Sequence, residues 1–177
     1  MNGRASKIGV SAGRLSMNAG DDDVRILNGL IGATLDSARH YKKVAGNVGN
    51  PSVRALFEHL STERKSITQA LQSQLGAISS NPMIESARNV SFTRRIFGNV
   101  RHAMDYGYIA LIDEVERGEE RVKAKYERAL TNEKLSTLSR SVVQNAYKSV
   151  CAGCAQMHAL KRYPNAERVH SERVEQW

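Results

Sequence analysis

The chain has 177 residues, of which 41% are hydrophobic and 25% charged, and its formal net charge is +8. This length suits one domain with a continuous core, and this composition argues against a chain that is disordered throughout. No run of about 18 apolar residues could span a bilayer, and the start of the chain lacks the apolar segment of a signal peptide. We therefore expect a cytoplasmic protein with no transmembrane segment and with reduced cysteines.

The first predicted element is a helix that begins at residue 21 and ends before Gly46, preceded by a flexible arm over residues 1–20. Asp21, Asp22 and Asp23 can cap the free N–H groups at its start. Apolar and small residues then recur every three or four positions, which predicts one buried helix face. These residues are Val24, Leu27, Ile31, Thr34, Ala38, Tyr41 and Ala45.

The second helix is predicted from Pro51 to about Gly76, and the third lies in the region 84–130. The inner face of the second helix carries Val53, Leu56, Leu60, Ile67 and Leu71. The inner face of the third carries Ile109, Ile112, Val115, Val122, Tyr126 and Leu130. Because Gly107 interrupts this region, a short extra helix is predicted over residues 91–104.

The fourth helix is predicted over about residues 133–162, with Thr131 and Asn132 as candidate caps and Pro164 beyond its end. Its inner face carries Leu135, Leu138, Val142, Ala146, Gly153 and Leu160. Four such helices predict an all-α protein, an antiparallel up-down four-helix bundle over residues 21–163, with the short extra helix before the third. Residues 164–177 form a C-terminal tail.

Four charged residues fall on or beside the predicted inner faces: Glu63, Arg64, Glu116 and Glu119. Charges inside a helix seam rarely persist unless they are paired. We expect an Arg64–Glu119 salt bridge between helices, with Glu63 and Glu116 in the same buried polar layer. Two alternatives remain, namely a carboxylate site for a metal or proton, and side chains that reach solvent.

Several short stretches resemble an uncharacterised bacterial ferritin-like four-helix-bundle family, the PA-type domain of unknown function. They are Leu27–Ile31, Asp36–Tyr41, Glu63-Arg64, Glu114–Glu119 and Tyr126–Leu130, within roughly residues 23–162. The resemblance implies the bundle, a ferritin-like classification and a possible link to stress physiology, without an established activity. Where the family pattern leads us to expect a histidine on the fourth helix, this chain has Cys154.

The ligands of a di-iron oxidase are not in place. Such a bundle takes a glutamate from each of two helices and Glu-x-x-His from each of the other two. The first helix offers no inward carboxylate, and Glu63 is followed three residues later by Ser66. Di-iron chemistry is therefore disfavoured, and we predict no catalytic residue. His40 and His59 are expected at the solvent side or flank of their helices.

The fourth helix carries a weaker candidate metal site, Cys151, Cys154 and His158, on one stripe. Thiolate and imidazole suit zinc or another transition metal such as copper(I), although a fourth ligand would have to come from elsewhere. Half-buried structural cysteines and a redox pair are the alternatives. Small residues on the same helix allow close approach of a neighbouring helix, which favours a homo-oligomer, in the simplest case a dimer.

Residues 91–104 contain no acid and place Arg94, Arg95 and Arg101 opposite an apolar helix face. Such an element could bind the phosphates of nucleic acid or an anionic membrane surface. The alternative is a connecting helix whose basic face is solvated.

The preferred hypothesis is a non-catalytic helical bundle that acts through protein association. A ferritin-like metal-binding or metal-storage protein and an anion-binding module are the alternatives.

Overall fold

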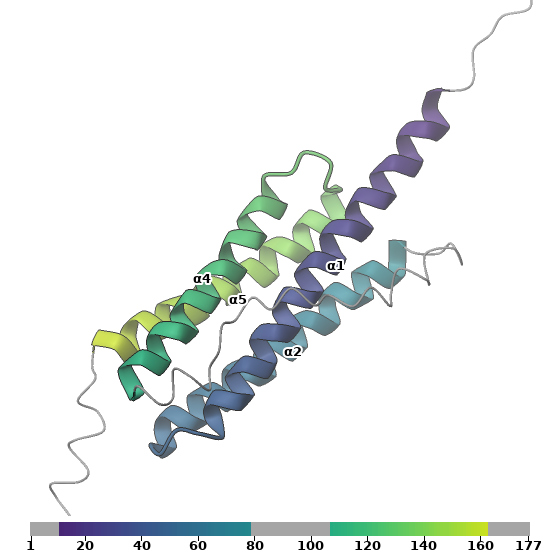
Figure 1. Cartoon of the computed structure of the whole chain (residues 1–177). Helices are drawn as coiled ribbons and strands as arrows, with labels where there is room; N and C mark the ends of the chain where they lie inside the picture. Colours follow the sequence, from purple (N-terminus) through teal and green to yellow (C-terminus); the bar gives the residue numbers. More distant parts are fainter. Residues whose placement is uncertain (1–10, 79–106, 163–177) are drawn as a thin grey trace, which may run out of the picture.

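The computed structural model describes residues 11–78 and 107–162 of the chain, and the side chains of residues 20–78 and 107–162. The described residues form helices and turns, and none of them is in a strand. The helices are α1 (Ser11–Ala45), α2 (Pro51–Ile78), α4 (Tyr108–Leu130) and α5 (Thr137–Arg162) (Figure 1). The predicted all-α four-helix bundle is confirmed. The predicted helix over 91–104 lies outside the described residues.

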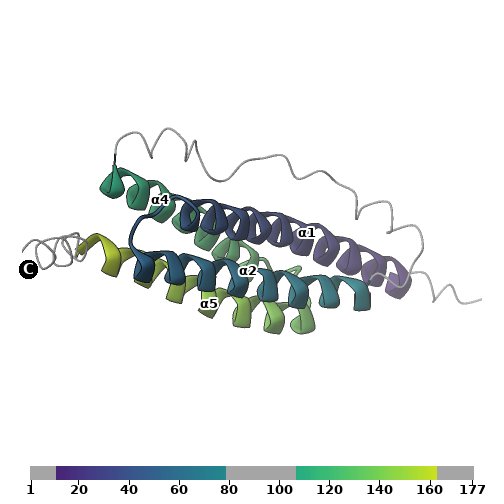
Figure 2. The same ribbon diagram turned by 90° about the horizontal axis from the view of Figure 1, so that it is seen from below.

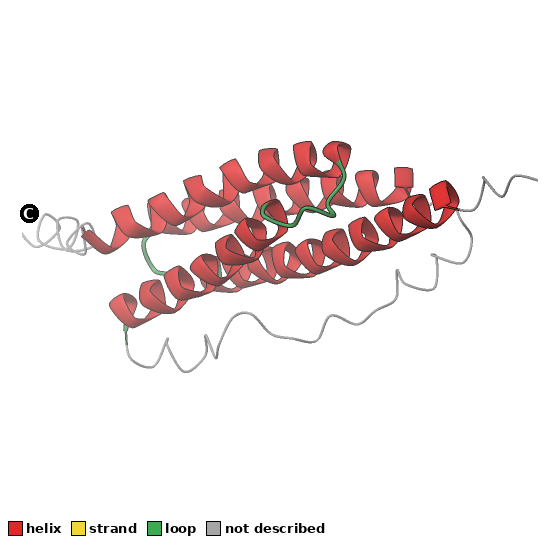
Figure 3. Cartoon of the chain, turned by 90° about the horizontal axis from the view of Figure 1, so that it is seen from above, coloured by secondary structure: helices red, strands yellow, loops and turns green. Residues whose placement is uncertain are grey.

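The four helices form a ring in which α1 packs on α2 and α4, and α5 packs on α4 and α2 (Figures 2 and 3). Each neighbouring pair runs antiparallel, whereas the diagonal pairs, α1 with α5 and α2 with α4, run parallel. Because α2 and α4 run in the same direction, the end of α2 and the start of α4 lie at opposite ends of the bundle (Figure 1). In chain order the four helices therefore run up, down, down and up.

The apolar core consists of two clusters, one towards each end of the bundle. One contains Leu27, Leu71 and Tyr126, and the other contains Phe57 and Met157. All seven residues of the predicted inner face of α1 are buried. A layer of buried polar residues separates the two clusters and includes Ser37, Ser61, Arg64 and Glu119. The polar layer thus lies at the middle of the bundle, where all four helices meet.

The predicted start of the first helix is wrong, because α1 begins at Ser11 and the aspartates lie inside it. The prediction that this helix has no inward carboxylate is also wrong, since Asp23 is buried. Its carboxylate accepts hydrogen bonds from the backbone N–H of Ser136, at 2.9 Å, and from the hydroxyl of Ser139, at 2.6 Å. The predicted aspartate cap therefore stabilises the start of α5 rather than that of α1.

The caps of the fourth helix also differ from the prediction. Thr131 ends α4, and its N–H donates to the carbonyl of Glu127. The helix α5 begins six residues later, where Ser136 accepts a hydrogen bond from the N–H of Ser139 at 3.3 Å. Asn132 lies in the turn and accepts from the N–H of Lys134.

Two residues of the predicted inner faces are exposed, Ile109 at 57% and Leu138 at 74%. Each lies in the first turn of its helix, at one end of the bundle, where few neighbours cover the helix. Beside Leu138, Ser139 takes the buried position because it bonds to Asp23. A regular helical repeat places a residue on a face but does not show how far along the helix the core extends.

His40 is buried, contrary to the prediction that it faces solvent or a helix flank. Burial, and secondarily the nearby Lys43 ammonium, lowers the pKa of His40 to about 4. The folded chain therefore protonates this imidazole near pH 4, whereas the unfolded chain does so near the ordinary value of about 6.5. Because the unfolded chain binds this proton more tightly than the folded chain does, lowering the pH below about 6.5 reduces the free energy of unfolding.

We expect the stability that His40 contributes to be complete above pH 6.5 and to be lost as the pH falls towards 4, by about 3 kcal/mol. The measurement is the free energy of unfolding in urea between pH 7 and pH 4 for the natural chain and for His40→Gln. The difference between the two chains should shrink as the pH falls. A difference that stays constant over this range contradicts the assignment.

No helix within residues 11–78 or 107–162 is long and apolar enough to cross a membrane.

Candidate functional site

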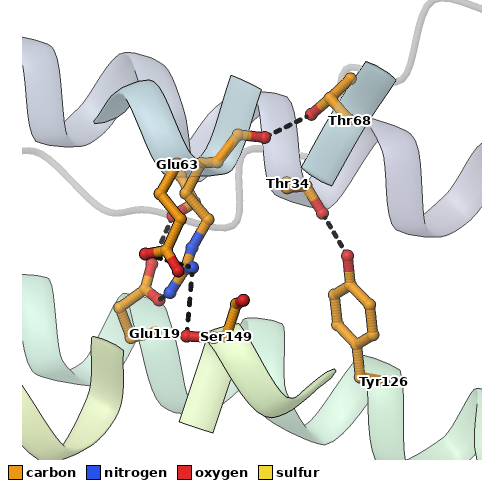
Figure 4. A network of polar contacts seen from close by, with 8 residues as sticks. Thr34, Glu63, Thr68, Glu119, Tyr126 and Ser149 are labelled. Atoms are coloured by element: carbon orange, nitrogen blue, oxygen red, sulfur yellow. Dashed lines mark hydrogen bonds and ion pairs between the residues drawn. The ribbon is translucent and has the colours of Figure 1, made fainter. Parts of the chain in front are cut away.

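The centre of the bundle holds a buried ion pair between two diagonal helices. Arg64 on α2 and Glu119 on α4 are both 0% exposed, and Arg64 Nη2 lies 2.7 Å from Glu119 Oε2. The salt bridge expected from the sequence between these two residues is present. In Figure 4, Ser149 and Glu63 lie beside Glu119, and both contact the guanidinium. Because charge-assisted hydrogen bonds at this distance are strong, the pair ties α2 to α4 across the core.

The remaining contacts of the pair come from the other two helices. Ser37 on α1 donates a hydrogen bond to Glu119 Oε1, and Arg64 Nη1 lies 3.4 Å from the carbonyl oxygen of Ser149 on α5. Glu63 reaches Arg64 Nη1 at 3.7 Å from the edge of the bundle, and its side chain is 30% exposed. One guanidinium and one carboxylate thus connect all four helices. We call these two side chains the central ion pair.

Gly153 on α5 makes room for the guanidinium. A Cβ atom at this position would lie 2.3 Å from Arg64 Nη2 and 3.5 Å from the hydroxyl oxygen of Tyr41. On the α1 side, Arg64 Cζ lies 5.8 Å from the centre of the Tyr41 ring, within the range of a cation–π interaction. The guanidinium therefore lies between the ring of Tyr41 and the backbone of Gly153, which has no side chain.

Electrostatics keep the Arg64 guanidinium charged and the neighbouring tyrosines protonated. Burial by itself would lower the pKa of Arg64, but Glu119 and Tyr41 raise this pKa above its ordinary value. Burial, and then the charge of Glu119, raises the pKa of Tyr41 well above its usual range. Burial raises the pKa of Tyr126 to about 12, and its hydroxyl lies 2.7 Å from that of Thr34 (Figure 4). Neither tyrosine is a base or a nucleophile near neutral pH.

The expected polar layer is only partly assembled. Glu116 does not reach the central ion pair; it lies on the outer seam between α4 and α5. There its carboxylate is 3.0 Å from His158 Nε2 and 2.9 Å from Lys161 Nζ. Lys161 also lies 2.9 Å from Asp113. Because Glu116 points to this outer seam while Glu119 is paired with Arg64 in the core, Glu63, Glu116 and Glu119 do not form one carboxylate cluster.

Cys151, Cys154 and His158 are not brought together either. Cys154 is buried, and burial, followed by the charge of Glu119, raises the pKa of its thiol to about 12. Cys151 is half-buried, and His158 faces Glu116. Within the described parts of the chain, no three His, Cys, Asp or Glu side chains are placed to hold a metal ion. The described part of a single chain therefore does not bring these three residues together, and Arg94, Arg95 and Arg101 lie outside the described residues.

Sequence reasoning missed Ser37 and Tyr41 as partners of the ion pair and Gly153 as its neighbour. Ser37 flanks the predicted inner face of α1, where a small polar residue carries no signal by itself. Tyr41 and Gly153 were predicted inward, but the pattern of a single helix does not show which side chain of another helix faces them.

Residues 22–132, more than half of the chain, match the model of a family described as a domain of unknown function (DUF2383). The matched region includes both members of the central ion pair and ends before α5. No curated protein shows significant similarity to the chain.

Proposed function

We propose that this chain, which belongs to the DUF2383 family, acts through protein association, as a homo-oligomer rather than as an enzyme. One observation supports this proposal above the others: α1 is longer than the bundle that it helps to form. It extends back to Ser11, and in Figures 1 and 2 its first turns (purple) continue past the end of α2.

The first residue of α1 described as buried is Asp23, and residues 11–20, which we call the projecting segment, span about 15 Å at the usual helical rise. This segment continues a longer helix, but helices in proteins owe most of their stability to the packing of one face against other elements. A second copy of the chain would supply such packing, since two projecting helices can lie side by side.

An exposed apolar side chain lies at the same end of the bundle. Asp23, just beyond the projecting segment, bonds to Ser136 and Ser139, and Leu138 stands between these two serines in the sequence. Leu138 is 74% exposed, the highest exposure among the large hydrophobic residues of the described ranges. Ile109, the other exposed large hydrophobic residue there, lies at the start of α4, at the opposite end. The more exposed of these two side chains therefore lies at the end of the bundle from which α1 projects, and we take this end as the contact surface.

The bundle centre supports the non-catalytic part of the proposal. Its guanidinium and carboxylate neutralise one another, and its tyrosines and Cys154 have raised pKa values. A general base or an activated nucleophile requires a pKa near the working pH, which these groups lack.

A ferritin-like relationship is a further part of the proposal. It is supported by the up-down-down-up order, since ferritin-like bundles have one long crossover connection.

Sedimentation velocity of the full chain tests the association. We expect a mass that is a multiple of 19.6 kDa and that falls on dilution. Leu138→Ser should weaken association about tenfold, because truncating an apolar interface residue removes more than a kcal/mol of binding energy. Ala19→Pro should also weaken it, because proline ends the projecting segment yet is tolerated as the first residue of the remaining helix.

Ile109→Ser is the matched control and should leave association unchanged. A natural chain that stays at 19.6 kDa at all concentrations would refute the proposal. An equal loss of association in Leu138→Ser and Ile109→Ser would refute the choice of surface.

A further inference from the structure

A groove lies between α1 and α4 on the surface of the bundle. Its volume is about 290 Å³, close to the lower limit for small-molecule sites, which is about 300 Å³. It runs towards the turn that follows α4, and Asn132 of this turn is one of its lining residues. None of the residues that line it belongs to the central ion pair.

The charged residues that line the groove are all basic. Arg25 comes from α1, and Lys125 and Arg128 come from α4. No carboxylate is among the described lining residues. The acids that act on two of these residues lie outside the groove: Arg25 pairs with Asp22 at 2.7 Å, and the charge of Lys125 acts on Asp36. No described carboxylate is within ion-pair distance of Arg128, so the groove has an excess of positive charge.

The C-terminus of α4 lies beside the groove, and by itself it would repel an anion because its free carbonyls carry partial negative charge. Arg140 from α5 offsets this partial negative charge. Its guanidinium donates hydrogen bonds to the carbonyl oxygens of Leu130 and Asn132, the second at 2.7 Å. The Asn132 side-chain oxygen accepts from the N–H of Lys134, which leaves the amide nitrogen of Asn132 as a donor for a ligand.

The floor of the groove is apolar and consists of Ile26, Leu30 and Ala129. We propose that this groove binds a small organic anion, in which a phosphate, sulfonate or carboxylate is joined to a short apolar group. The anionic group would lie against Arg128, and the apolar group would lie on the floor. This inference is independent of the proposed association.

The probe is 1-anilinonaphthalene-8-sulfonate, whose fluorescence rises in an apolar site, with hexyl phosphate as competitor. We expect saturable binding of the probe by the full chain, displaced by hexyl phosphate but not by inorganic phosphate at the same concentration. Arg128→Glu should weaken binding about tenfold, since a charge-assisted contact is typically that strong. Lys65→Glu, the same charge reversal at an exposed position on the α1–α2 side, is the control and should bind as the natural chain does.

Equal weakening in both variants, or in neither, would overturn the proposal, because binding would then depend on net charge or on another surface. An unchanged melting temperature in Arg128→Glu shows that the loss is local. Binding to vesicles of phosphatidylglycerol without binding of hexyl phosphate would also overturn it, because a flat anionic surface would then be the ligand.

Discussion

Arg64→Ala should lower the free energy of unfolding by about 3–5 kcal/mol, the usual effect of removing one partner of a buried ion pair. The substitution leaves Glu119 in the core without its cationic partner, with Ser37 still bonded to its carboxylate. It also leaves an empty volume next to Tyr41 and Gly153. The quantity to measure is the unfolding free energy from urea titration, with the slope checked to be unchanged.

Lys65→Ala provides the comparison, because this neighbour of Arg64 is exposed on the same helix. A surface substitution of this kind usually changes stability by less than about 0.5 kcal/mol. If Arg64→Ala were no more destabilising than Lys65→Ala, the buried guanidinium would not be a stabilising connection between helices.

Gly153→Ala should lower stability by about 2–4 kcal/mol, although alanine is usually the better helix former. The added Cβ would lie 2.3 Å from Arg64 Nη2, so the guanidinium would have to move. The end of an exposed arginine could move at little cost. This one is fully buried and bonded to Glu119, so its displacement would weaken the central ion pair.

Gly20→Ala is the matched control, because this glycine is also helical and a Cβ there would meet nothing within 4 Å. It should raise stability by about 0.5–1 kcal/mol. In an Arg64→Ala background, Gly153→Ala should lose most of its effect, because the atom with which it collides is gone. A Gly153→Ala chain as stable as the natural one would mean that the core adjusts around the methyl group.

The helices and the central ion pair could be predicted from the sequence because both depend on regular spacing. The inner faces of α1 and α2 follow the helical repeat closely, and a charge within such a face requires a partner. Arg64 and Glu119 each interrupt an apolar face near the middle of a long helix, and their opposite signs suggest the pair. Glu116 was wrongly included, because at the edge of a face a rotation of a few degrees decides which seam a side chain joins.

The remaining features depend on how the helices are placed relative to one another. Asp23 resembles a cap of its own helix in the sequence, and only the parallel arrangement of α1 and α5 brings it to Ser136. Leu138 fits the helical repeat of α5 but lies beyond the end of the core. The Cys151, Cys154 and His158 stripe satisfies the spacing of metal ligands, yet their side chains have different surroundings.

A double-mutant cycle across Arg64 and Glu119 is the most direct test that these two side chains act as one unit at the centre of the bundle. Arg64→Met and Glu119→Leu should each destabilise the chain by about 3–5 kcal/mol, because each leaves one buried charge unpaired. The double variant should be far closer in stability to the natural chain, which gives a coupling energy of several kcal/mol. Additive losses, with a coupling energy near zero, would contradict the account.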